Sequence, residues 1–259
     1  MAPEDDSAGG STGDAYEGAE RRVSSLSRDD ALAGTTLFVR YEDTTDGTLE
    51  HAVEGRIDES ALRSNLHLAA HTAFEADGVT VDGRSFGSFL RDAPEYRFVE
   101  WLLTALLYEI RRTGTSDGLS KLYASIERID RIDFDGDAVT DGTGRDSASF
   151  DLVVRDERAD PLVIATFGED GTPTGAVPVD SFVERASRVA EATGTLAAAF
   201  FVTSRFATGA TEVAAEATRG GLFSRTARRS FVTLSRQRGF HLCLVEAQDE
   251  TCHLTVPDL

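Results

Sequence analysis

Apolar and polar residues alternate along some stretches of the chain and form unbroken apolar runs in others. Alternation over residues 35–43 predicts a strand with one exposed face. Two apolar stretches, residues 147–155 and 161–167, are joined by a short charged turn and predict an antiparallel pair of strands. Residues 196–203 are almost wholly apolar, which is typical of a strand buried on both faces. A helical crossover should place this strand parallel to residues 161–167.

Helical periodicity is strongest over residues 95–113, where apolar side chains surround most of the circumference and indicate a core helix. Asp180 is expected to cap a second helix that stops at Gly194. A further helix is expected over residues 223–238, followed by a buried strand over residues 240–247. The predicted fold class is therefore α/β, with a mixed central sheet flanked by helices.

Three regions follow from the pattern. Residues 1–33 are acidic, small and polar, and predict a disordered tail. Residues 34–93 predict a small α+β N-terminal region, and residues 94–259 form the main core.

Within the N-terminal region, residues 50–55 are expected to return as the hairpin partner of the first strand. Asp58 should lie near the N-cap of a short helix. Residues 66–75 predict a strand, with an extension of that helix as the alternative. In such a strand His67 and His71 are roughly 13 Å apart, too far to share one metal ion. We therefore expect two solvated histidines.

The charge balance indicates the kind of environment in which the protein works. The chain has 45 acidic and 26 basic residues, a net charge of −19, and Lys121 as its single lysine. This composition resembles that of haloarchaeal proteins, whose surface carboxylates hold water and ions. We expect a cytoplasmic, halophilic protein in which Cys243 and Cys252 are reduced and unpaired. No apolar run approaches about 18 residues, so no membrane partner is expected.

Two acids stand where metal-dependent chemistry would need them. Asp151 lies early in the strand over residues 147–155. Glu109 lies among apolar neighbours near the end of the long predicted helix. It is either a carboxylate directed into a cleft or an ion-pair partner of Arg111 or Arg112. Residues 135–137, Asp-Gly-Asp, predict a tight turn before this region.

The element order over about residues 95–247, together with these two acids, resembles the restriction-endonuclease-like superfamily, whose motif is written PD-(D/E)XK. In that superfamily a helix Glu, a second-strand Asp and a third-strand Glu-x-Lys surround one or two magnesium ions. The resemblance implies Asp151 as the strand acid and Glu109 as the helix acid. The third-strand motif aligns with residues 165–167, Ala-Thr-Phe, so its acid and its lysine are both missing. The candidates for migrated substitutes are Glu169, Asp170, Glu184, Arg185 and Arg188. The N-terminal half resembles uncharacterised proteins of halophilic archaea, which implies no function.

An arginine-rich stretch contrasts with the acidic remainder. Residues 217–245 contain no acid. On a helix, Arg225, Arg229 and Arg236 share one face, with Arg228 to one side. Guanidinium groups match phosphate in geometry, so this face predicts contact with DNA or RNA. The alternative is an internal or subunit contact with some of the chain's many acids.

These observations predict a catalytically weakened or inactive nuclease-like protein that binds nucleic acid or a protein partner and needs no cofactor. One alternative is an active magnesium-dependent nuclease with migrated ligands. Another is a scaffold or regulatory protein that binds no nucleic acid. The missing third-strand charges favour a protein that is not an enzyme.

Overall fold

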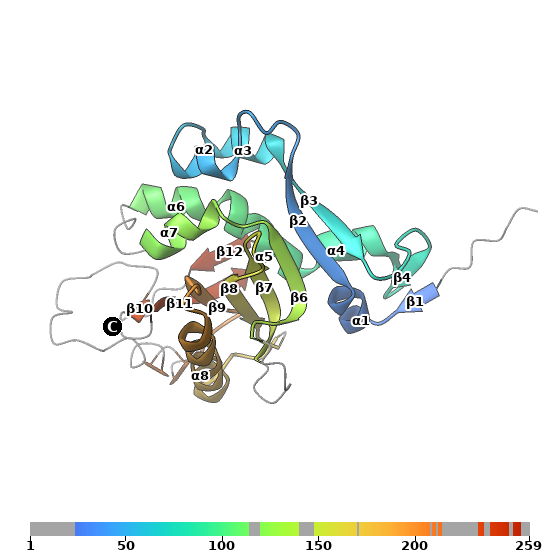
Figure 1. Cartoon of the computed structure of the whole chain (residues 1–259). Helices are drawn as coiled ribbons and strands as arrows, with labels where there is room; N and C mark the ends of the chain where they lie inside the picture. The colour runs from blue at the N-terminus through green and yellow to red at the C-terminus, as the bar shows by residue number, and fades with distance from the viewer. Residues whose placement is uncertain are drawn as a thin grey trace, which may run out of the picture.

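A mixed β-sheet flanked by helices forms the body of the protein in the computed structural model (Figure 1). The structure describes residues 24–113, 120–139, 148–169, 171–207, 209–210, 212–213, 233–235, 239–248 and 251–254. In spatial order, the strands of the sheet are β10 (Thr233–Ser235), β11 (Phe240–Gln248), β9 (Ala198–Thr203), β8 (Pro161–Phe167), β7 (Ser149–Arg155), β6 (Arg131–Asp137), β2 (Thr35–Tyr41) and β3 (Leu66–Thr72). A further strand, β12 (Thr251–Leu254), also pairs with β11. The predicted α/β class is confirmed.

The central pairings agree with the sequence pattern. Strands β6, β7 and β8 form an antiparallel meander, in which Leu152 lies opposite Ala165. Strand β9 lies parallel to β8, with Val163 opposite Ala198, and β11 lies parallel to β9. Both the predicted antiparallel pair and the predicted parallel neighbour are therefore confirmed. The crossover between β8 and β9 is the helix α8 (Ala176–Thr193).

The charged turn between β7 and β8 is organised by Asp156. Its carboxylate accepts hydrogen bonds from the amides of Arg158 and Asp160, both at 3.0 Å, and it forms an ion pair with Arg128. Burial acts to raise the pKa of Asp156, but these hydrogen bonds and the Arg128 charge outweigh it and lower the pKa. These contacts therefore order the turn that joins β7 to β8.

Two apolar layers cover the two faces of the sheet. One lies beneath α8, and the other lies beneath α4 (Phe86–Asp92), α5 (Pro94–Thr104), α6 (Leu106–Thr113) and α7 (Ser120–Ile126). The helix predicted over residues 95–113 is present but interrupted at Ala105, where φ is −110° and ψ is −44°. Gly194 ends α8 in the left-handed region, as predicted. The start of α8 was placed wrongly, because Gly175 is the N-cap and Asp180 lies inside the helix.

The N-terminal region departs from the prediction at two places. Residues 24–33 form β1 (Ser24–Leu26) and α1 (Arg28–Ala33), so the expected tail is too long at its C-terminal end; residues 1–23 lie outside the described part. Ser27 caps α1, and two residues of this helix are buried. The expected hairpin return over residues 50–55 is wrong, because α2 (Leu49–Val53) begins there with a capping box at Thr48.

The remaining N-terminal elements follow the pattern. The helix α3 (Glu59–Asn65) begins at Asp58, whose side chain accepts a 2.8 Å hydrogen bond from the Ala61 amide. Residues 66–72 form a strand rather than a continuation of that helix. A small second sheet contains β1, β4 (Val79–Val81) and β5 (Arg84–Ser85).

Two further predictions are corrected. The expected turn at residues 135–137 lies within β6, although Asp135 has a turn-like φ of 46°. The helix expected over residues 223–238 is wrong at residues 233–235, because these pair with β11 as strand β10. None of the helices in the described ranges combines the length and the apolar character that a membrane span requires.

Candidate functional site

Asp151 lies in β7 beside the end of β8. One carboxylate oxygen, Oδ2, accepts a 2.7 Å hydrogen bond from the backbone amide of Phe167, the last residue of β8. The side chain is exposed at the surface. The carboxylate thus links two neighbouring strands, and one of its oxygens is already used by the fold.

The surroundings of Asp151 raise its pKa. Shielding from water by the surrounding residues is the main cause, and the charge of Asp135 acts in the same direction. The Phe167 amide and the charge of Arg185 oppose it. Arg185 is itself held in place, because Nη1 donates a 2.7 Å hydrogen bond to the carbonyl of Ser149 and the guanidinium lies 5.0 Å from the Phe150 ring centre. A raised pKa disfavours the ionised form that binds a metal ion.

The positions that align with the third-strand motif are packed. Ala165 is fully buried in the apolar layer beneath α5. Phe167 contacts Phe98 of that helix edge to face, with ring centres 5.8 Å apart. Between them, the Thr166 hydroxyl is buried and has no hydrogen-bond partner in the described part of the chain. Ala165 and Phe167 therefore serve the packing of the core.

Glu109 is placed on α6. Its Oε1 lies 3.4 Å from Nε1 of Trp101, which donates a hydrogen bond to it. The charged groups that shift the pKa of Asp151 come from β6 and α8, and Glu109 is not one of them. Arg111, one expected ion-pair partner of Glu109, donates hydrogen bonds to the Tyr123 hydroxyl and the Val53 carbonyl. These contacts give no sign that the two candidate acids form one site.

The proposed substitutes are scattered. Glu169 is exposed just after β8, and Glu184 and Arg188 are exposed on α8. Only Arg185 acts on Asp151, and it is a cation rather than a metal ligand. Asp170 lies outside the described residues. Across the ranges that the structure describes, no three His, Cys, Asp or Glu side chains are grouped so that they could hold a metal ion.

Asp135 is an acid near Asp151 that the sequence pattern did not indicate as part of the site. Its Oδ1 accepts a 3.4 Å hydrogen bond from the Ser149 hydroxyl, and its charge acts on Asp151. The Asp-Gly-Asp pattern indicated a turn, which concealed the pairing of this segment with β7. The two-residue period that continues from Ile132 and Phe134 is the signal that could have placed Asp135 in a strand.

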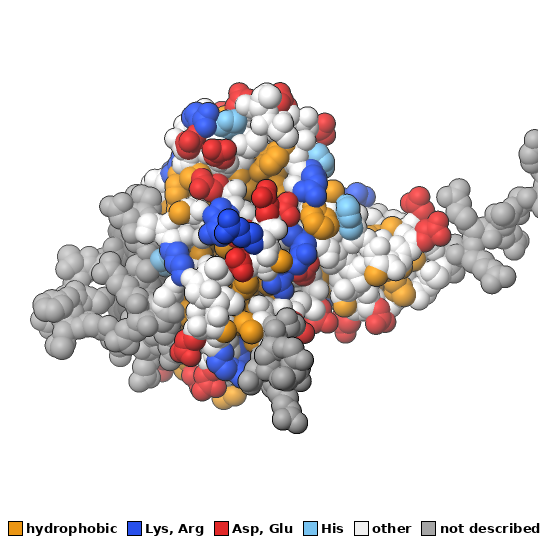
Figure 2. Space-filling view, in the orientation of Figure 1, with side chains coloured by type: hydrophobic (Ala, Val, Ile, Leu, Met, Phe, Trp, Pro, Cys, Tyr) orange, Lys and Arg blue, Asp and Glu red, His pale blue; other side chains and the backbone are white. Residues whose placement is uncertain are grey.

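The arginine residues predicted to contact phosphate, Arg225, Arg228, Arg229 and Arg236, lie outside the described residues. The strand β10 interrupts the helix on which their shared face was predicted. The angular argument that joined Arg236 to the other three therefore loses its basis. On the face shown in Figure 2, basic side chains are interspersed with acids, so no continuous basic surface lies there.

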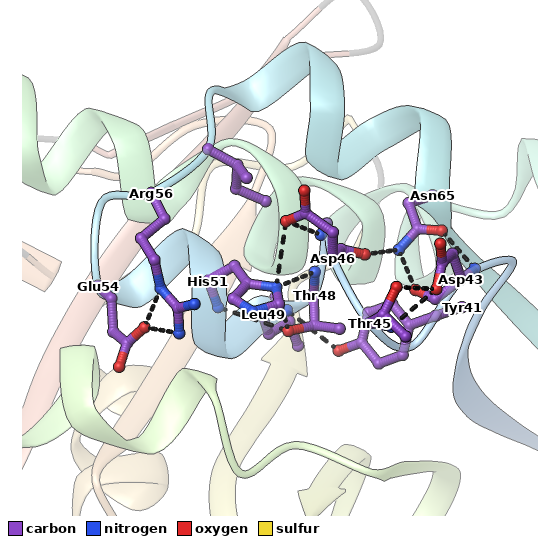
Figure 3. A network of polar contacts seen from close by, with 12 residues as sticks. Tyr41, Asp43, Thr45, Asp46, Thr48, Leu49, His51, Glu54, Arg56 and Asn65 are labelled. Carbon is purple, nitrogen blue, oxygen red and sulfur yellow. Dashed lines mark hydrogen bonds and ion pairs between the residues drawn. The ribbon is translucent and has the colours of Figure 1, made fainter.

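A polar network joins the segment after β2 to the start of β3 (Figure 3). The Asn65 side chain donates hydrogen bonds to the carbonyls of Asp43 and Asp46, at 2.7 and 2.9 Å, and accepts one from the Asp43 amide at 2.7 Å. The Tyr41 hydroxyl accepts from the Leu49 amide at 3.3 Å. Asp46 also lies 3.5 Å from Nδ1 of His51. These contacts are local, and they order the loop and fix the residue that precedes β3.

A buried titratable group, His241, lies on β11, away from Asp151 in the strand order of the sheet. His241, on β11, is 4% exposed, and within the described part of the chain neither ring nitrogen has a hydrogen-bond partner. Burial, aided by the charge of Lys121, lowers its pKa to about 4. The ammonium of Lys121 donates a 2.6 Å hydrogen bond to the carbonyl of Gly239. His241 is thus neutral at physiological pH.

The fold and the site define an α/β protein in which Asp151 of β7 is bonded to the end of β8 and lies near the charges of Asp135 and Arg185. Residues 26–259 match the family described as Domain of unknown function (DUF7527), and the chain belongs to this family. No curated protein and no solved structure matches the chain.

Proposed function

We propose that this protein is a non-catalytic relative of the restriction-endonuclease-like nucleases that acts by binding nucleic acid. The order of elements supports the relationship: helices α5 to α7, the meander β6–β7–β8, the crossover helix α8 and the parallel strand β9. The strands β6, β7, β8 and β9 are also consecutive in space.

One observation supports the loss of catalysis most directly. The Asp151 carboxylate is bound to the Phe167 amide, while Ala165 and Phe167 fill the apolar layer. Magnesium is usually held by one or two carboxylates with several waters, close to the substrate phosphate. Among the described residues no three potential ligands are grouped at Asp151, and the charge of Arg185 beside it disfavours a bound cation.

The nucleic-acid ligand is supported by the acid-free stretch of residues 217–245 in a chain of net charge −19. Each arginine that neutralises a phosphate releases counterions and adds about one unit to the salt dependence of binding. In molar salt, directional guanidinium–phosphate hydrogen bonds retain an advantage over less directional charges.

The first test is a cleavage assay with magnesium or manganese on single- and double-stranded DNA and RNA. We expect no metal-dependent cleavage. Efficient cleavage that disappears in Asp151→Ala would contradict the proposal and support an active nuclease with migrated ligands.

The second test is an electrophoretic shift at several salt concentrations. Replacing Arg225, Arg229 and Arg236 together with Gln should weaken binding equally across sequences and reduce the salt slope by about two to three. The matched control replaces the exposed residues Arg56, Arg63 and Arg84 with Gln, which changes the net charge equally. Binding by the wild type that neither variant alters, or that both alter equally, would contradict the proposal, as would no binding at all.

A further inference from the structure

The strand β3 forms one margin of the large sheet (Figure 1). It pairs antiparallel with β2, and no other described strand pairs with it. Its first end is fixed by the Asn65 network, and just after its last residue the Ala73 amide donates a 2.8 Å hydrogen bond to the Gly34 carbonyl. The outer edge is therefore a preformed row of peptide groups without strand partners.

The composition of β3 does not protect this edge. Soluble proteins usually blunt an exposed edge strand with charged residues, proline or a bulge. Leu66–Thr72 reads LHLAAHT and contains no Asp, Glu, Lys, Arg or Pro, although 27% of the whole chain is charged. None of its seven residues is buried, and the pairing with β2 is regular along its whole length. The edge is thus long, regular and uncharged.

We propose that β3 pairs antiparallel with β3 of a second copy of this chain, about a twofold axis at Ala69. This register places His67 opposite the partner's His71, and Leu68 opposite the partner's Ala70. Side chains of like character then share each face, so the strand is complementary to itself. Leu66 and Leu68 already pack against the apolar layer of the sheet, and the pairing removes more of their surface from water. A twofold interface of this kind closes at two copies and leaves no free edge on β3.

The second copy is favoured over an extended peptide of another protein because the edge lacks any charge to select a foreign partner. At low salt the net charge of each copy opposes association, and molar salt screens this repulsion over a few ångströms. The proposed dimer is therefore a high-salt species.

The test is sedimentation equilibrium of the full chain in molar KCl at pH 7.5. We expect a dimer whose dissociation constant changes with substitutions on β3 and not with substitutions elsewhere. Ala70→Lys, at an exposed position of β3, should raise the dissociation constant at least tenfold. The matched control, Ala192→Lys in the exposed last turn of α8, should leave it unchanged.

The register is tested by charge pairs. His67→Lys combined with His71→Lys should raise the dissociation constant about tenfold, because two opposed like-charge pairs form. His67→Glu combined with His71→Lys sets opposite charges across the axis and should restore the dimer. Circular dichroism checks that each variant is folded. A monomer at every concentration, a dimer indifferent to Ala70→Lys, or equal behaviour of the two double variants would overturn the proposal.

Discussion

Strands at the centre and at the margin of the sheet differ in how far their residues are buried. In the centre, all six residues of β9 are buried, and helices cover both faces. At the margin, none of the seven residues of β3 is buried, and one edge has no described partner.

The difference indicates which property each region controls. In the centre, Ala165 and Phe167 supply packing. At the margin, the outer edge of β3 has peptide groups without a described strand partner. We therefore expect substitutions in the centre to change stability and substitutions at the margin to change association.

The largest expected effect is on the free energy of unfolding, which a substitution in the centre should lower more than one near the margin. Phe200 is fully buried on β9 and contacts the rings of Phe98 and Trp101, with ring centres 5.3 and 6.3 Å away. Phe200→Ala should lower the free energy of unfolding by about 3–5 kcal/mol. The control is Phe38→Ala on β2, whose ring is half-buried and should cost less than about 2 kcal/mol. Urea denaturation followed by circular dichroism measures both, and equal costs would remove the distinction between centre and margin.

The next effect concerns protonation of the buried residue His241. The pKa of His241 is lowered to about 4 in the folded chain, below its ordinary value of 6.5. Between these values the unfolded chain binds the additional proton, so the free energy of unfolding falls as the pH falls. The loss attributable to His241 should reach about 3 kcal/mol below pH 4. His241→Leu should remove this part of the pH dependence, measured as unfolding free energy from pH 7 to pH 4. An unchanged pH profile in that variant would show that the ring is accessible to water.

The smallest effect tests whether Asp151 serves the fold. Its pKa is raised on folding, so its ionised form opposes folding, and this cost appears as the pH rises through the unfolded-state value. Asp151→Asn keeps an acceptor for the Phe167 amide and should change the unfolding free energy by less than about 1 kcal/mol at pH 7. Asp151→Ala leaves that amide without its acceptor and should cost about 1 kcal/mol. Thermal unfolding compares the two variants; a larger cost for Asn than for Ala would mean that the charge itself stabilises this end of the sheet.

Strongly patterned segments could be predicted from sequence because one interaction dominates each of them. The apolar run of β9 is typical of a strand buried on both faces, and the cap at Asp58 acts within one turn of helix. Short elements were missed where tertiary packing, rather than the local sequence pattern, determines the secondary structure. The six residues of α1 have only two buried members, and α8 begins at Gly175, which has no side chain to signal a cap. The stretch that ends in β10 shows that a short apolar pattern fits helix or strand equally.

The site could be predicted only in part for a similar reason. Asp151 occupies the strand that its alternating neighbours indicated. Its relation to Arg185 and Asp135 depends on how α8 and β6 lie against β7, which no local pattern encodes. That residues 165 and 167 are Ala and Phe, without charge, could be read from the sequence, whereas the packing of Phe167 on Phe98 required the structure.

The single lysine of this chain also makes it a natural reporter of its own assembly. Lys121 on α7 donates hydrogen bonds to the carbonyls of Gly239, before β11, and Gly194, after α8, so one ammonium joins three segments that are distant in sequence. Burial lowers its pKa, which leaves more of the amine in the neutral, reactive form wherever a reagent can reach it. Because the chain has no second lysine side chain, amine modification read at residue 121 reports on one defined position at the junction of these three segments.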